Sequence, residues 1–258
     1  MQSLLLVSAI LGAATVLSAA TFKSTDRIIP LVQDGGGSKT SVTVLNLSSE
    51  TALFELSFRP KKGFLENWEL QFNAPDMKVT GSAVSGSVAP GASVTIETTG
   101  TAKDLTRGYA VVNCFNNKLL AAVARVESAN GTLTITAASE LDTRFMLPIE
   151  SSADVKTEIV WVSESPYAEA DCSFRDSAGK VVASDRFSFG TGDLLAQVTF
   201  SVADRYPDLK AFRGVMECKV TFPNAGMYDE LTFSALAIRR KGSEPASAIA
   251  TVSASDWQ

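Results

Sequence analysis

The sequence predicts an all-β protein made of two tandem immunoglobulin-like antiparallel β-sandwich modules that follow a signal peptide. Three observations lead to this prediction: an uncharged apolar start, short runs in which apolar residues alternate with polar ones, and blocks that recur in the same order in both halves of the 258-residue chain. Alternation at every second residue is typical of a half-buried β-strand, whereas an amphipathic helix repeats about every 3.6 residues.

The start of the chain has the features of an export signal. Its first twenty residues carry no charged side chain, contain an apolar run from Leu4 to Leu17, and end on Ser18-Ala19-Ala20, which fits the small-x-small rule for cleavage. The run is short for a membrane span. An uncleaved anchor or a buried apolar segment is the alternative, because the usual Lys or Arg before the run is missing. We expect residues 1–20 to be a signal peptide, and the mature chain to be secreted or periplasmic with no stable membrane span.

Three runs show the strand alternation most clearly, namely Thr40 to Leu47, Ala52 to Phe58 and Ser93 to Thr99. None of them contains Gly or Pro, which weaken strands. Turn-forming sequences such as Ala89-Pro90-Gly91 lie between such runs. Short strands separated by turns indicate a β-sandwich of about 100 to 120 residues. One exception is Val202 to Leu209, which predicts a single helical turn that crosses from one sheet to the other.

Recurring blocks divide the mature chain into two modules. Five blocks of the first half match blocks of the second, and the spacing between them changes only by loop-sized amounts. The matched blocks are Arg27 to Pro30 with Arg144 to Pro148, Lys39-Thr40 with Lys156-Thr157, Leu56 to Arg59 with Cys172 to Arg175, Arg107-Gly108 with Arg213-Gly214, and Ala121 to Arg125 with Ala235 to Arg239. We therefore predict modules at residues 21–140 and 141–258.

The module openings carry a family resemblance. IPLVQDGGGSKTSVTVLNLSSETALFELSF and MLPIESSADVKTEIVWVSESPYAEADCSFRDSAGKVVASDRFSF resemble the tandem β-sandwich repeats of secreted bacterial proteins, such as those of acidobacteria. The resemblance consists of packing and turn residues and brings no catalytic motif. The second module has Ser151-Ser152-Ala153-Asp154 where the repeats have an Asp-Gly-Gly-Gly loop, which weakens any role of that loop as a shared binding element.

Composition excludes several classes of function. The chain contains no His, which removes the Ser-His-Asp and Cys-His nucleophiles and the usual nitrogen ligand of zinc or copper. Its net charge of −5 gives no basic footprint for a phosphate backbone. We expect no nucleic-acid partner, no metal and no cofactor.

The three cysteines leave two interpretations open. In the repeat, Cys172 corresponds to Leu56 and Cys218 to Val112, so both replace apolar core residues. They could form a disulfide, as pairs commonly do in exported proteins, or remain two buried thiols. Cys114 is expected to be an inert core thiol, because no His is present to activate it.

Aromatic residues provide the candidate binding site. Phe64, Trp68 and Phe72 recur every fourth residue in KKGFLENWELQF, an insertion that the second module lacks. Exposed on a loop, these rings could stack on sugars or form a contact patch. The alternative is that they pack onto their own sheet.

Two other groups of residues are candidates for chemistry. Asp34-Gly35-Gly36-Gly37 could wrap a phosphate or a calcium ion, but it lacks the Lys of a phosphate loop and offers one carboxylate, so a flexible turn is favoured. Glycoside cleavage needs two carboxylates across a cleft. The candidates for that role are Asp171, Asp176, Asp185, Asp193, Glu50 and Glu55. Their spacing is that of solvent-facing strand positions, so no catalytic residue is assigned.

These observations favour a secreted, non-catalytic binding or structural protein that contacts an extracellular or envelope partner, a protein or a glycan, through surface loops. A carboxylate-dependent extracellular glycan hydrolase is the alternative. A periplasmic chaperone with paired immunoglobulin-like domains is disfavoured, because no basic anchoring cleft is evident in the sequence.

Overall fold

The computed structural model describes residues 27–62, 68–74, 76–137, 144–163, 168–189, 196–221, 233–249 and 252–253. These residues form an all-β structure of four antiparallel sheets, which agrees with the predicted fold class at the level of strand content and sheet type. The three clearest alternating runs are strands β2 (Lys39–Asn46), β3 (Ala52–Pro60) and β7 (Ser93–Thr98). The predicted helical turn is also present, as α1 (Val202–Arg205) followed by the 3₁₀ turn η1 (Pro207–Leu209).

Two five-stranded sheets form the first half of the chain. The first contains, in order, β1 (Arg27–Asp34), β8 (Thr106–Cys114), β3, β6 (Ala83–Val88) and β5 (Lys78–Thr80). The second contains β10 (Gly131–Thr136), β9 (Leu120–Ser128), β2, β7 and β4 (Phe72–Asn73). Strand β2 shows how the sequence forms these layers: Val42, Val44 and Asn46 are buried, and the residues between them are partly exposed. The buried side chains of both sheets form one hydrophobic core.

The second half contains a five-stranded and a four-stranded sheet. The first of these contains, in order, β14 (Val181–Ser188), β13 (Glu169–Asp176), β16 (Phe212–Thr221), β11 (Arg144–Ser151) and β19 (Val252–Ser253). The other contains β15 (Gln197–Ser201), β12 (Val155–Ser163), β17 (Phe233–Lys241) and β18 (Ser247–Ile249). A second core lies between them and is rich in aromatic rings, with Trp161 surrounded by Phe187, Phe189, Phe200 and Phe233.

The strand orders of the two halves correspond. The order β1-β8-β3-β6 in the first half matches β11-β16-β13-β14 in the second, and β10-β9-β2-β7 matches β18-β17-β12-β15. The halves differ at their sheet edges. In the first, β5 pairs with β6 and β4 pairs with β7, and both added strands come from the segment between β3 and β6. In the second, β13 and β14 are joined by a tight turn at Asp176–Lys180, and α1 and η1 follow β15.

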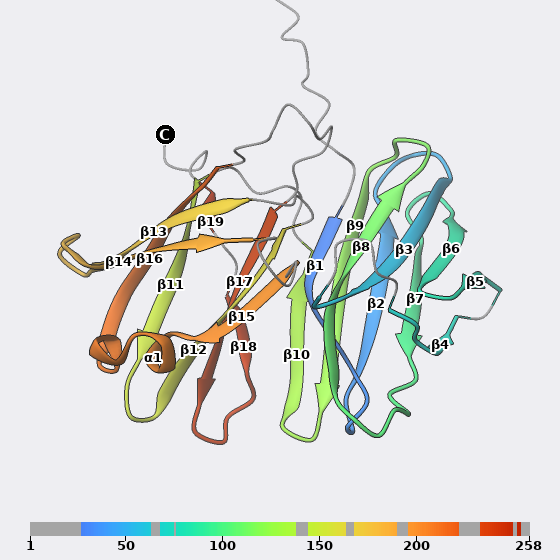
Figure 1. The fold of residues 1–258 in the computed structure, drawn as a ribbon. Coiled ribbons are helices and arrows are strands. Elements are labelled where there is room, and N and C mark those ends of the chain that lie inside the picture. Colours follow the sequence, from blue (N-terminus) through green and yellow to red (C-terminus); the bar gives the residue numbers. More distant parts are fainter. Residues whose placement is uncertain are drawn as a thin grey trace, which may run out of the picture.

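The two halves stand side by side and pack against each other (Figure 1), with β1 against β12 and β17, and β10 against β18. A small buried cluster joins Ile28, Tyr109 and Val111 of the first half to Val162 and Ala196 of the second. Because these residues lie on the outer faces of their sheets, the contact covers part of the first half's outer surface.

A buried glutamine crosses this contact. The side chain of Gln197 is fully buried, and its Nε2 donates hydrogen bonds of 2.7 Å to the carbonyl oxygens of Pro30 and Gly108. The pairing of β1 with β8 shifts register between Ile29 and Val32, and such a bulge leaves a residue outside the ladder. Gln197 therefore bonds a carbonyl at the position where the first half's own sheet is irregular.

Cys172 on β13 lies directly opposite Cys218 on β16, and the structure joins the two by a disulfide. Both residues belong to the core of the second half. Cys114 is a buried free thiol, and its Sγ accepts a hydrogen bond from the backbone N–H of Lys118 at 3.3 Å. Within the described residues, no helix has the length and apolar character needed to cross a bilayer.

Candidate functional site

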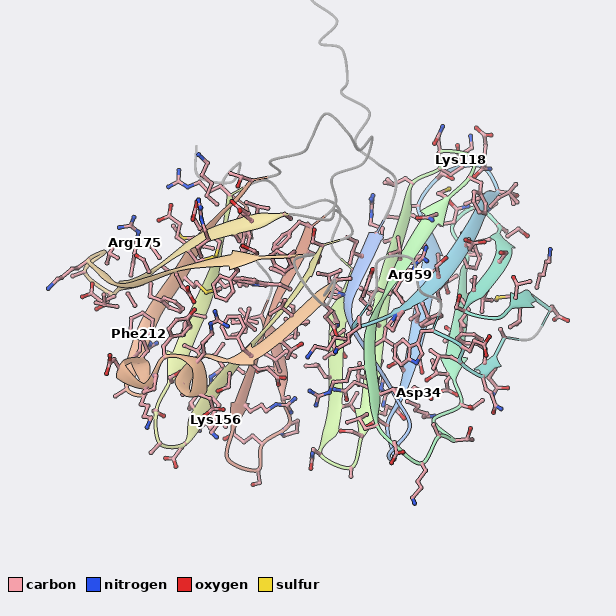
Figure 2. All side chains as sticks on the ribbon, in the orientation of Figure 1. Asp34, Arg59, Lys118, Lys156, Arg175 and Phe212 are labelled. Carbon is pink, nitrogen blue, oxygen red and sulfur yellow. A yellow bond between two sulfur atoms is a disulfide. The ribbon has the colours of Figure 1, made fainter. Side chains whose placement is uncertain are left out.

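An open hollow of about 400 Å³ lies at one end of the first half, beside Trp68. Its walls are residues 68–71, which precede β4, and Thr99, Thr101 and Ala102, which follow β7, together with Asp34 and Thr106. Figure 2 shows Asp34 near the lower end of the first half, far from Lys118 at the upper end. Asp34 belongs to the Asp-Gly-Gly-Gly turn and Trp68 to the aromatic insertion. The hollow therefore brings together two segments that lie far apart in the sequence.

The glycine turn places Asp34 in the wall. Gly36 and Gly37 both have positive φ, +58° and +80°, as a type I′ hairpin turn requires, and the N–H of Ser38 donates to the carbonyl of Gly35 at 2.9 Å. A Cβ on Gly35 would lie only 2.9 Å from the carbonyl oxygen of Ala102, so glycine lets this turn pack closely on the neighbouring loop. The expected turn is thus present, but it is packed rather than free.

The Asp34 carboxylate holds that loop in place. Its side chain is almost fully buried, and Oδ1 accepts the backbone N–H of Gly100 at 2.9 Å. The Asp34 carbonyl oxygen also accepts the hydroxyl of Thr106 at 3.0 Å. Among the described residues, no group of three or more His, Cys, Asp or Glu is arranged to hold a metal ion. We therefore assign Asp34 a structural role in shaping the hollow.

Trp68 forms the floor of the hollow and is not an exposed ring. Only 9% of its surface is accessible, and it belongs to the core of the first half. Its ring lies so close to Gly108 that a Cβ there would be 2.7 Å from Cζ3. Phe72 is partly buried, with its ring centre 4.9 Å from that of Phe58. The interpretation of these residues as exposed rings does not hold for Trp68, Phe72 is only partly exposed, and Phe64 lies outside the described residues.

The physical reason lies in the described end of the insertion, residues 68–72. Phe72 begins β4, which pairs with β7 at the edge of the sheet, and both Trp68 and Phe72 pack into or against the core of the first half. For Trp68 and Phe72 the structure shows the alternative, in which the rings pack onto their own sheet. Packing leaves only the accessible part of Trp68 for contact with a ligand.

The rim of the hollow is polar. Thr101 Oγ1 donates to Gln71 Oε1 at 3.2 Å and lies 3.1 Å from the hydroxyl of Thr99, and all three side chains are exposed. Glu69 is also exposed and lines the same hollow. The lining residues include two carboxylates, Asp34 and Glu69, but neither Lys nor Arg. The sequence does not predict that Glu69 lies beside Asp34 of the glycine turn, because the two residues are far apart in the chain and no short motif links them.

Two further hollows continue along the same segment. One, of about 440 Å³, is lined by residues that include Lys39, Thr99 and Glu127, and another, of about 560 Å³, is lined by residues that include Thr95 and Glu97. Lys39 pairs with Glu97 at 2.8 Å and with Glu127 at 3.6 Å. The hydrogen bond with Glu97 raises the pKa of Lys39, and bonds from Lys39 and then Ser41 lower the pKa of Glu97. The positive charge of Lys39 is therefore neutralised by its neighbours.

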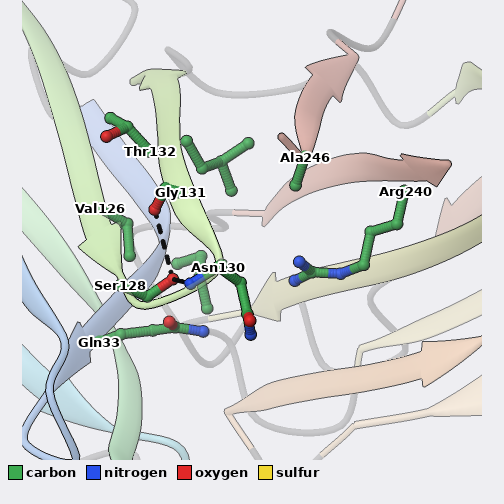
Figure 3. Close-up of a pocket in the computed structure, with 10 residues that line it drawn as sticks. Gln33, Val126, Ser128, Asn130, Gly131, Thr132, Arg240 and Ala246 are labelled. Carbon is green, nitrogen blue, oxygen red and sulfur yellow. Dashed lines mark hydrogen bonds between the residues drawn. The ribbon is translucent and has the colours of Figure 1, made fainter. Parts of the chain in front are cut away.

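A pocket between the two halves is too small for an organic ligand. Gln33, Ser128 and Asn130 line it from the first half, and Arg240 and Ala246 from the second (Figure 3). Its volume is about 20 Å³, which is room for about one water molecule. We interpret this pocket as a small gap that remains where the two halves pack together.

The carboxylates weighed for glycoside cleavage have local partners. Asp171 pairs with Arg186 at 2.7 Å, and Asp185 pairs with Arg205 at 2.9 Å. Asp176 accepts two backbone N–H groups of its own turn, from Ala178 and Lys180. Glu50 pairs with Lys118, Glu55 accepts the hydroxyl of Ser57, and Asp193 lies outside the described residues. None of the five described carboxylates lines the hollow beside Trp68.

The sequence matches no protein-family model, and a comparison with curated proteins also finds no match.

Proposed function

We propose that this protein is a secreted, non-catalytic binding protein built from two tandem immunoglobulin-like β-sandwich modules. In this proposal residues 1–20 are a signal peptide, residues 21–140 and 141–258 are the modules, and the mature chain is secreted or periplasmic. The hollow beside Trp68 is the surface through which the first module contacts an extracellular or envelope partner.

The correspondence between the halves supports the tandem arrangement. Beyond strand order, the matched glycines Gly108 and Gly214 have the same surroundings: a Cβ on either would clash with a carbonyl oxygen on the adjacent strand, that of Arg59 or Arg175, and would lie 2.7 Å from an aromatic ring. The glycine recurs in both matched Arg-Gly blocks because, in each half, the adjacent strand and an aromatic ring leave no space for a Cβ at this position.

The observation that carries the binding role is the construction of the hollow itself. A partly accessible indole forms the floor, an amide and hydroxyl groups converge on the rim, and the buried Asp34 fixes the opposite wall. Its volume of about 400 Å³ falls within the range of about 300–1,000 Å³ typical of ligand sites. Concave surfaces with a few convergent polar groups are the usual form of a binding site.

One observation keeps the carboxylate-dependent glycan hydrolase as a second candidate, since Asp34 and Glu69 line the same hollow. The burial of Asp34 and its bond to Gly100 favour a structural role for that carboxylate. Incubation of the purified protein with extracellular polysaccharides, followed by analysis of released reducing ends, separates the candidates. Release that Glu69→Gln abolishes would establish the hydrolase and overturn the binding proposal.

Obstruction of the hollow tests the binding role. The mature full-length protein is incubated with isolated cell envelopes and with insoluble extracellular polysaccharides, and the bound fraction is measured after sedimentation. Thr101→Trp places a bulky side chain on the rim, whereas Thr134→Trp places the same side chain at an exposed position of β10. We expect the first variant to lose binding and the second to retain it, and equal binding by both would contradict the proposal.

A further inference from the structure

We infer that the hollow beside Trp68 binds a segment of an uncharged polysaccharide chain, one segment per protein molecule. This inference rests on the proposed binding function and names its ligand class. Three features of the described residues support it: the chemistry of the lining, the sign of its charges, and its continuation along β7 and the loop that follows β7.

The lining combines the two kinds of group that recognise sugars. The small accessible part of Trp68 and the partly buried Leu70 give an apolar patch for contact with the C–H groups of a sugar ring. Gln71, Thr99 and Thr101 place an amide and two hydroxyls on the rim, already linked to one another by hydrogen bonds of 3.1 and 3.2 Å. Hydroxyl and amide groups both donate and accept, so they can exchange these bonds for bonds to the hydroxyls of a saccharide.

The charges exclude anionic chains. Asp34 and Glu69 line the hollow, and Glu97 and Glu127 line the two neighbouring hollows. Lys39 is the cation in this series, and it is paired with both Glu97 and Glu127. In the hollow beside Trp68, a uronic acid, sulfated or phosphorylated chain would meet carboxylates and no lining Lys or Arg, and in the neighbouring hollow the lining Lys39 is already paired with carboxylates. Unfavourable like-charge contacts act as a selection against such ligands.

The length of the surface indicates a chain and not a single sugar. The three hollows follow one another along a single segment: Thr95 and Glu97 line one, Thr99 and Gly100 the next, and Thr101 and Ala102 the hollow beside Trp68. Thr99 lines two of them, so these two are adjacent. An extended ligand could follow this path, and affinity should therefore increase with the number of sugar units.

One site per chain follows from the difference between the halves. The second half lacks the inserted segment that carries Trp68 and Gln71, and at the matched glycine, Gly214, the neighbouring ring is that of Phe212 from its own strand. Among the described residues, only the first half therefore has this lining.

Titration calorimetry with the mature full-length protein tests the inference. The probes are neutral hexasaccharides of glucan, xylan and mannan, their trisaccharides, and hexagalacturonate as the acidic probe. We expect at least one neutral hexasaccharide to bind with a stoichiometry of one, more tightly than its trisaccharide, and hexagalacturonate to bind at least about tenfold more weakly. Gln71→Ala and Thr101→Val should each weaken binding about tenfold, the size expected for loss of a hydrogen bond to the ligand. Thr134→Val is the matched control and should bind as the natural protein does.

A charge reversal sharpens the test. Glu69→Lys should raise the affinity for hexagalacturonate, because it replaces a carboxylate of the lining by an ammonium group. Binding of hexagalacturonate as tight as that of the neutral probes in the natural protein would overturn the inference. So would neutral binding that both Gln71→Ala and Thr101→Val leave unchanged. If no saccharide binds while Thr101→Trp still abolishes envelope binding, the inference fails and the proposed function stands; if Thr101→Trp also has no effect there, both fail.

Discussion

The indole ring of Trp68 lies directly over Gly108, at a distance that leaves no space for a Cβ on that glycine. A methyl group there would be 2.7 Å from Cζ3 of the indole and would also clash with the carbonyl oxygen of Arg59 on the adjacent strand. The floor of the candidate binding site therefore depends on the absence of a side chain at a position in a different strand.

Substitution of this glycine should destabilise the first half. Gly108→Ala forces the Trp68 ring and β3 apart, and overpacking of this kind costs about 1–3 kcal/mol. Urea denaturation followed by tryptophan fluorescence measures the change. Gly86→Ala is the comparison, because its nearest neighbour would be a ring atom of Phe54 at 3.3 Å, which can shift, and we expect a smaller loss. Equal losses for the two variants would contradict this account of Gly108.

Removal of the Gln197 amide should weaken the contact between the halves. Gln197→Leu leaves the carbonyl oxygens of Pro30 and Gly108 buried without this donor. Each unsatisfied buried group costs about 1–3 kcal/mol. Because the substitution also removes Gln197 Oε1, which is buried without a hydrogen-bond partner, we expect a net loss of about 1–3 kcal/mol in thermal or urea unfolding. Gln71→Leu, at an exposed position, should change stability by less than about 0.5 kcal/mol. A Gln197→Leu protein as stable as the natural one would show that these bonds contribute nothing net.

Thiol counting tests the bridge between Cys172 and Cys218. Alkylation of the denatured, unreduced protein should modify one cysteine, Cys114, and mass spectrometry should locate the label there. Reduction should lower stability by about 3–4 kcal/mol, since the bridge spans a sequence separation of 46. A Cys114→Ala variant should give no label before reduction. Three labelled cysteines in the unreduced natural protein would disprove the bridge.

Acid should remove the contribution of Glu217 to stability. Its Oε1 accepts hydrogen bonds from Arg144, and its Oε2 accepts Nε of Arg175 at 2.7 Å. The bonds from Arg144 and then Arg175 lower the pKa of Glu217 below its ordinary value of 4.5. A carboxyl whose pKa is lower in the folded state stabilises the fold above its unfolded-state pKa, and that contribution is lost as pH falls through the folded-state pKa.

The measurement is urea unfolding of the natural protein and Glu217→Gln across the acid range. The variant should be less stable at neutral pH, and the difference should shrink once the pH falls below about 4.5. Glu244→Gln, at an exposed position with a surface pair to Lys241, is the control and should show little difference at any pH. A stability difference for Glu217→Gln that is independent of pH would exclude the ionic explanation.

Alternation and turn residues were sufficient to predict three of the strands, β2, β3 and β7, and a turn at the glycines. Val42 and Val44 have the spacing of one sheet face, and Gly36 and Gly37 supply the positive φ values that the turn needs. These signals are local, because they depend on the period of the strand and on the backbone freedom of glycine. The helical turn that begins at Val202 could also be predicted from a local signal, the proline that follows it closely at position 207.

The candidate site could not be predicted in this way. The spacing of Trp68 and Phe72 is compatible with exposed rings, and their burial depends on which sheet edges the insertion pairs with, which is a tertiary property. That Asp34 and Glu69 line the same hollow also depends on tertiary structure and not on a local sequence pattern. The bonding of Gln197 to the other half has no local signal, because a glutamine near the start of a strand is usually exposed.

The insertion leaves the strand pairing around it unchanged. Strands β3 and β6 pair from Ala52 with Val88 to Ser57 with Ala83, although a long excursion separates them, and β13 pairs with β14 across a tight turn. The sandwich therefore tolerates connectors of very different length at this hairpin. This position is a natural graft point: a segment exchanged between β3 and β6, or introduced between β13 and β14, could give the same scaffold a different recognition surface without a new fold.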